Sequence, residues 1–152
     1  MTPELVEGLQ GARDFLNTSP ETQTMRDKHP GGEFSIRPLV TNGEEGNRAA
    51  YRPGSSGQHG VGNAADVEIV GPDGNRINDE YQGAKLLDQS GAFNRIGSYV
   101  NESGIPRWHV DMKDSYRSSY WINAQDPDKY PDGIRYYDSS SRDFWLRDIK
   151  QR

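Results

Sequence analysis

A long polar, glycine-rich segment in the first half of the chain constrains the fold more than any other feature. Residues 41–63 contain repeated glycines and few apolar side chains. Such a segment offers no apolar face to a core, so we expect a long ordered loop there. Long loops inside a compact domain usually carry function. Helices and strands must therefore come from the sequence on either side.

The remaining sequence supports only a modest hydrophobic core. Apolar residues make up 32% of the chain, which also has 17 glycines and 9 prolines. This balance favours a loop-rich α+β fold, because long amphipathic helices would need more leucine and alanine. We predict a single domain over residues 1–152, with a small antiparallel sheet flanked by helices and the long glycine-rich loop.

Hydrophobic spacing predicts where the elements lie. A helix is expected over residues 4–16, with Thr2 as its N-cap and Pro3 in its first turn, followed by a surface loop over residues 17–33. A second helix is expected over residues 79–90, capped by Asn78. Strands are predicted at residues 34–40, 64–70, 93–100 and 108–112. The last thirty residues are aromatic and polar, with a short amphipathic end.

Charge and composition exclude several classes of partner. The net charge is −5 and no basic stripe is present, so a nucleic acid partner is not expected. No apolar run is long enough for a membrane span, and the first residues lack the regions of a secretory signal. A substrate outside the cytoplasm would then require delivery by lysis, a phage particle or specialised secretion, or a signal already removed.

Two histidines and one aspartate are the candidate metal ligands. With no cysteine in the chain, a metal site must use histidine and carboxylates. His59 precedes the predicted strand that contains Asp66, and a carboxylate among apolar neighbours needs a partner such as a cation. His109 lies in a later strand, where period-two alternation puts it on one face with Asp111. Two imidazoles, a carboxylate and water suit catalytic zinc, although three independent hydrogen-bonded residues remain the alternative.

The motif His59-x-x-Gly62-x-Ala64-x-Asp66, followed by Trp108-His109-Val110-Asp111, resembles a family of zinc peptidases. That family comprises D-alanyl-D-alanine carboxypeptidases and phage L-alanyl-D-glutamate endolysins, and its metal site is shared with the hedgehog signalling domain. The similarity covers roughly residues 34–121 and includes Gly97-Ser98-Tyr99, Arg117 and Trp121. Two departures stand out: Gly57 replaces a serine of the signature, and Pro106 lies where several relatives carry the catalytic acid.

The resemblance implies one zinc ion held by His59, Asp66 and His109, and hydrolysis of peptide bonds in peptidoglycan or its peptide fragments. It implies a site of action in the periplasm or at the cell wall. The candidate general base is Asp111, which could equally support His109, or else Glu102. Candidates for binding the substrate are Arg117, Arg37, Arg52 and Trp121.

Two further functions remain open from the sequence. One is a non-catalytic module that keeps the metal for stability or recognition, which Pro106 favours. The other is a structural part of a virion or secretion machine, which the acidic chain without a recognisable signal favours weakly. Digestion of cell walls by the purified protein would separate the peptidase from both.

Overall fold

One mixed β-sheet forms the centre of the protein, in a computed structural model that describes residues 1–39, 62–101, 103–123 and 133–152. Its strand order is β1-β2-β4-β3-β5-β6, and every pair is antiparallel except the parallel pair β3–β5. The strands are β1 (Ser35–Pro38), β2 (Ala64–Val70), β3 (Arg95–Val100), β4 (Pro106–Asp111), β5 (Tyr120–Asn123) and β6 (Ile134–Tyr137). The predicted α+β class is confirmed.

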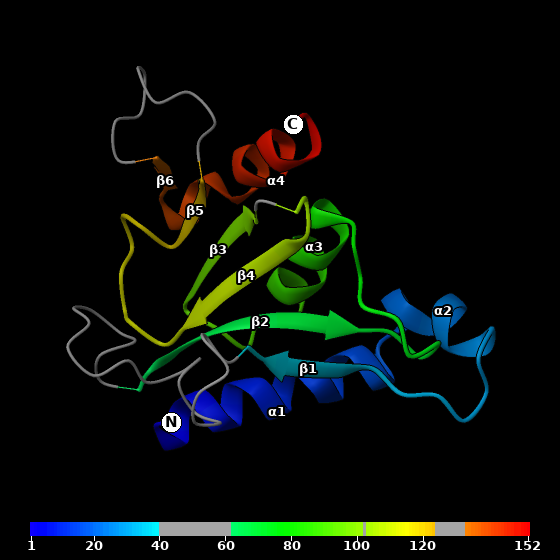
Figure 1. Ribbon diagram of the computed structural model, residues 1–152. Coiled ribbons are helices and arrows are strands. Elements are labelled where there is room, and N and C mark those ends of the chain that lie inside the picture. The colour runs from blue at the N-terminus through cyan, green and yellow to red at the C-terminus, as the bar shows by residue number, and fades with distance from the viewer. Residues whose placement is uncertain (40–61, 102, 124–132) are drawn as a thin grey trace.

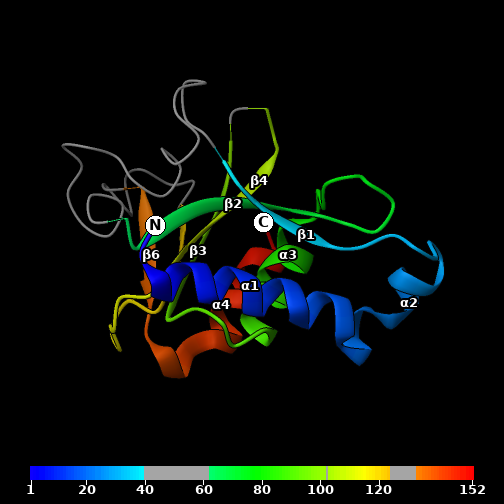
Figure 2. The same ribbon diagram turned by 90° about the horizontal axis from the view of Figure 1, so that it is seen from below.

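Helices α1, α3 and α4 lie together on one side of this sheet, as Figures 1 and 2 show. They are α1 (Pro3–Thr18), α3 (Glu80–Gln89) and α4 (Arg142–Lys150). Their apolar side chains join those of the strands in one buried cluster, which includes Leu5, Leu16, Leu87, Trp108, Val110, Trp145 and Ile149. The other side of the sheet is therefore free to carry polar residues.

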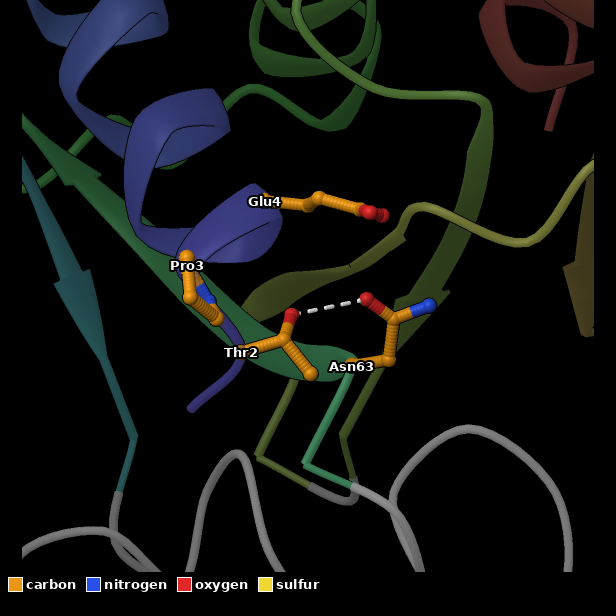
Figure 3. A pocket seen from close by; sticks show the side chains of 4 residues that line it. All are labelled: Thr2, Pro3, Glu4 and Asn63. Atoms are coloured by element: carbon orange, nitrogen blue, oxygen red, sulfur yellow. Dashed lines mark hydrogen bonds between the residues drawn. The ribbon is translucent and has the colours of Figure 1, made fainter.

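The N-terminal helix is predicted correctly, and it is fastened to the start of β2. The Thr2 hydroxyl oxygen accepts a hydrogen bond from the Leu5 backbone N–H, and Pro3 occupies the first turn. The same hydroxyl donates to the side-chain oxygen of Asn63 at 2.9 Å (Figure 3). Thr2 also donates its backbone N–H to the Gly62 carbonyl. This contact fixes the chain directly before the strand that carries Asp66.

Three details of the predicted structure are wrong. Residues 17–33 are not a continuous loop, because they contain the short helices η1 (Pro20–Thr22) and α2 (Gln23–Asp27). They form because the Ser19 side chain caps η1 and the buried Thr22 hydroxyl donates to the Leu16 carbonyl. The N-cap of α3 is Asp79, not Asn78, since the Asp79 carboxylate accepts from the Gln82 N–H. The C-terminal part contains β5, β6 and the short helix η3 (Ser139–Ser141), which hydrophobic spacing did not predict.

The predicted glycine-rich loop lies almost entirely outside the described residues, which resume at Gly62. In the described ranges, no helix is both long and apolar enough to cross a lipid bilayer. Pro38 lies in β1, an edge strand of the sheet, which agrees with the position expected for a proline.

Strand alternation gives the sheet two chemically different faces. Trp108 and Val110 of β4 point into the helix side and are fully buried. Trp108 packs so closely on α3 that a Cβ atom at Gly83 would lie 2.1 Å from its ring. Because alternate residues of a strand face opposite sides, His109 and Asp111 lie on the face away from the helices. The packing of Trp108 thus sets the orientation of the neighbouring histidine.

We predict that Gly83→Ala destabilises the protein. The added methyl group would overlap the Trp108 ring, and overpacking of this kind costs about 1–3 kcal/mol, more than the gain of up to about 1 kcal/mol from a better helix former. Gly11→Ala in α1 is the matched control, since a Cβ there meets no atom within 4 Å. Urea unfolding should show a lower midpoint for the first variant and a slightly higher one for the second. A Gly83→Ala variant as stable as the wild type would contradict this packing.

Candidate metal centre

Five residues from five neighbouring strands form a single row across the open face of the sheet. Asp66 is opposite His109, His109 is opposite Gly97, Gly97 is opposite Trp121, and Trp121 is opposite Tyr136. We call this set the Asp66 row. The sheet thereby gathers two predicted metal ligands and one predicted substrate-binding residue at one place, although they are far apart in the sequence.

The side chains of Asp66 and His109 face each other at a distance that suits a shared metal ion. The Nδ1 atom of His109 lies 3.6 Å from an Asp66 carboxylate oxygen, which is long for a hydrogen bond. Two ligand atoms on one tetrahedral zinc ion are separated by about 3.3 Å, given bond lengths near 2 Å. Both side chains remain partly exposed, at 13% for His109 and 16% for Asp66. This pair therefore fits two of the three expected protein ligands.

Asp111 lies behind His109 and holds its second ring nitrogen. The distance from His109 Nε2 to the Asp111 carboxylate is 2.6 Å, and the Asp111 side chain has no exposed surface. Since the carboxylate accepts hydrogen bonds, Nε2 carries the proton and the lone pair of a neutral ring lies on Nδ1, toward Asp66. Metal-binding histidines commonly receive this kind of support from a carboxylate.

Arg95, which the sequence analysis did not single out, fixes Asp111 in turn. It is opposite Asp111 in the β3–β4 pair, and its Nε and Nη2 atoms donate to the carboxylate at 2.8–3.0 Å. The backbone N–H of Lys113 donates to the same carboxylate at 3.1 Å. From the sequence alone, the alternation of side chains along β3 could predict that Arg95 and Gly97 share a face. Only the strand register identifies Asp111 as the partner of Arg95.

Trp121 closes the side of the centre next to His109. Its ring lies 4.8 Å from the His109 ring and 4.8 Å from the guanidinium carbon of Arg95. A Cβ atom at Gly97 would come within 2.2 Å of the indole, so only glycine lets the ring lie flat on β3. Tyr136, which is 54% exposed, continues the aromatic surface, with ring centres 6.1 Å apart.

Other predicted site residues lie elsewhere or outside the described ranges. His59, Arg52 and Glu102 belong to segments that are not described. Arg37 is exposed on β1 and pairs with Glu68 at 2.6 Å. Arg117 is exposed and adjoins Ser118, whose hydroxyl accepts a hydrogen bond from Arg95.

No group of three or more metal-binding side chains exists within the described residues. The Asp66–His109 pair would need a third ligand from outside them, and the sequence motif names His59 for that position.

The charges around His109 shift its protonation. Burial lowers the pKa of His109, but hydrogen bonds and the negative charges of Asp111 and Asp66 raise it more, so that it lies above 6.5. Burial raises the pKa of Asp111, while hydrogen bonds from His109 and Arg95 lower it more, so that it lies below 3.8. In the metal-free protein the two groups thus stabilise each other in their charged forms.

We predict that His109 of the metal-free protein titrates above pH 6.5, and NMR of its ring protons can measure this titration. Because folding raises the pKa of His109, protonation of its ring stabilises the folded protein. This contribution is complete below the pKa of His109 in the unfolded chain, and it is lost as the pH rises through the pKa of His109 in the folded protein. Asp111→Asn should lower the midpoint of His109, because the variant removes the carboxylate that stabilises the charged ring. A midpoint that does not change in Asp111→Asn would mean that Asp111 does not hold the ring.

Comparison with known proteins does not assign this geometry to a family. No protein-family model, no curated protein and no solved structure matches the chain. The observations that bear on function are therefore the sequence motif and the arrangement on the open face of the sheet of Asp66, His109, Asp111, Arg95 and Trp121.

Proposed function

We propose that this protein is a zinc-dependent peptidase that hydrolyses peptide bonds in peptidoglycan stem peptides or cross-links. The observation that carries the proposal is the facing pair of Asp66 and His109, with Asp111 behind the imidazole. Nδ1 of His109 and an Asp66 carboxylate oxygen lie 3.6 Å apart, on side chains that are 13% and 16% exposed. In this proposal His59 supplies the third ligand, and the peptide substrate is met in the periplasm or at the cell wall.

Zinc held by Asp66, His109 and His59 would lower the pKa of a bound water toward neutrality and polarise a carbonyl group. The protein's own residues then have separable tasks. Asp111 keeps the proton on Nε2 of His109, so that Nδ1 stays available as a ligand. Arg95 neutralises the buried Asp111 and prevents its rotation, since a paired guanidinium fixes a carboxylate in both distance and plane.

The environment of Asp111 favours support of His109 over general-base catalysis. A general base must reach the proton that it removes, whereas Asp111 is fully buried and already accepts hydrogen bonds from His109, Arg95 and Lys113. Glu102 remains the second candidate, to be tested directly.

Substrate binding is assigned to residues at the rim of the site. Trp121 lies against His109 and offers a flat apolar surface to the residue next to the scissile bond. Arg117 is exposed next to Ser118, which contacts Arg95, and we assign it to a substrate carboxylate. Arg37 and Arg52 complete the proposed set. A guanidinium binds a carboxylate through two parallel hydrogen bonds, which suits the free carboxylates of stem peptides.

The second candidate function is a non-catalytic zinc module used for recognition or assembly, including a structural part of a virion or secretion machine. Two observations favour it. Pro106, at the start of β4, stands where several of the peptidases that the motif resembles carry an acidic residue. The carboxylate of Asp111, which lies nearest to His109 Nε2, already accepts hydrogen bonds from other residues. Such a module would bind zinc through the same residues without cutting peptides.

We predict one zinc ion per chain, measured by metal analysis after dialysis. His109→Ala and His59→Ala should each abolish tight binding, because two remaining protein ligands seldom hold zinc. His29→Ala is the matched control: His29 is exposed and lies outside the sequence motif, so this variant should keep its zinc. Stoichiometric zinc in the His59→Ala, His109→Ala double variant would contradict the site.

Digestion of purified cell walls, with product analysis, tests the peptidase itself. Asp111→Asn should lose zinc affinity and activity together if Asp111 supports His109. Glu102→Gln should lower turnover by about two to four orders of magnitude with normal zinc content if Glu102 is the general base. An Asp111→Asn variant that keeps zinc but loses turnover would instead make Asp111 the base. A zinc-loaded wild type that cuts no bond would leave the non-catalytic module as the function.

A further inference from the structure

The C-terminal part of the chain fastens β5, the strand that carries Trp121, from the side of the sheet away from the metal centre. β5 has only four residues, and it pairs with β3 in the parallel arrangement. Tyr120 and Ile122 face the helices and join the core, whereas Trp121 faces the open side. Figure 1 shows α4 beside β5 and β6. Because so short a strand forms few backbone hydrogen bonds, its position also depends on contacts from the helix layer.

Arg152, two residues after α4, joins α3 and β5 through one guanidinium group. Its Nε and Nη2 atoms donate to the two carboxylate oxygens of Glu80, in the first turn of α3, at 2.9 and 2.6 Å. Its Nη1 atom donates to the backbone carbonyl of Asn123, the last residue of β5. The side chains of Arg152 and Glu80 are only 14% and 11% exposed. A guanidinium paired with a carboxylate in this two-bond geometry is held in one orientation.

Glu80 is itself anchored to the centre of the sheet. The hydroxyl group of Ser98, a fully buried residue of β3, donates to the Glu80 carboxylate at 2.7 Å. Ser98 is opposite Trp108 in the β3–β4 pair, and Trp108 directly precedes His109. The contact of Arg152 with Glu80 therefore ties the end of β5 to the part of the sheet that carries His109.

A second contact from α4 holds the backbone of Trp121 directly. The indole N–H of Trp145 donates to the Trp121 carbonyl at 2.9 Å. Trp145 is fully buried and stacks on Tyr120, with ring centres 4.6 Å apart. The Tyr120 hydroxyl donates to Asp88 of α3 at 2.7 Å. Tyr120, Trp121 and Asn123 are thus each held from the helix layer.

We propose that Arg152 is a positioning residue for the metal centre, which holds β5 where the Trp121 ring lies against His109. The ring lies flat on Gly97, so a movement of β5 carries it along β3 and changes the 4.8 Å separation from the His109 ring. This inference rests on the proposed function only where Trp121 is taken to contact a substrate. An Arg152 with a purely structural role would stabilise the fold without influencing the position of the Trp121 ring.

NMR of the His109 ring protons in the metal-free protein tests this inference, because an aromatic ring at 4.8 Å shifts their resonances. Trp121→Leu gives the resonance positions without the indole. Arg152→Gln should move the His109 signals part of the way from the wild-type positions toward those of Trp121→Leu. The signals are compared at a pH above the titration of His109 in every variant. Arg147→Gln is the matched control, since Arg147 is on the same helix but pairs with Asp148, and its His109 signals should match the wild type.

Two further variants separate the role of Arg152 from the effect of an unpaired carboxylate. Arg152→Gln leaves Glu80 partly buried without its cationic partner, which can disturb the structure by itself. The Glu80→Gln, Arg152→Gln double variant removes that charge and should show the same His109 shifts as the single variant. Trp145→Phe deletes the donor to the Trp121 carbonyl but keeps an aromatic ring, and it should move the His109 signals in the same direction.

The outcomes separate this inference from the proposed function. Wild-type His109 signals in a folded Arg152→Gln variant, or a change that disappears in the double variant, would show that Arg152 does not position Trp121. Hydrolysis of a soluble stem peptide is measured on the same samples. Arg152→Gln should raise KM severalfold with unchanged kcat and zinc content, as expected for a loss of substrate binding. Moved His109 signals in a protein that cuts no peptide refute the peptidase alone. Cleavage with unmoved signals refutes the positioning role alone.

Discussion

The antiparallel pairing of β2 with β4 is the constraint on which the rest of the protein depends. It places Asp66 opposite His109 and, through alternation, sends Trp108 and Val110 into the core. A shift of this register by one residue would turn the histidine into the helix layer and the tryptophan to the surface. The buried Trp108, packed against Gly83, resists such a shift. The core therefore determines the geometry of the open face.

Charge on the open face is organised in parallel rows across the strands. Asp66 and His109 form one row, with Asp111 and Arg95 on one side of it and Arg37, Glu68 and Arg107 on the other. Asp111 is fully buried, which would be costly without the paired guanidinium and imidazole. Opposite charges thus keep the imidazole in one orientation, while Trp121 covers it from the side.

Hydrophobic periodicity was sufficient to predict much of this fold but only part of the site. It predicted α1, the strand from Ala64 to Val70 and the shared face of His109 and Asp111, because these depend on local spacing. It did not predict β5 and β6, which are four residues each and gain their stability from pairing with distant strands. Arg95 was missed for the same reason: strand register is a tertiary property, and the sequence shows only which residues can share a face.

A crystal structure of the protein grown with zinc, with anomalous data collected on both sides of the zinc absorption edge, tests the central claim most directly. We expect one strong zinc peak per chain, bonded to Nδ1 of His109 and to the Asp66 carboxylate. The Nε2 atom of His109 should remain on Asp111, and the third protein ligand should be His59. Zinc bonded through Nε2 of His109, zinc bound away from Asp66, or no zinc at all would contradict the account.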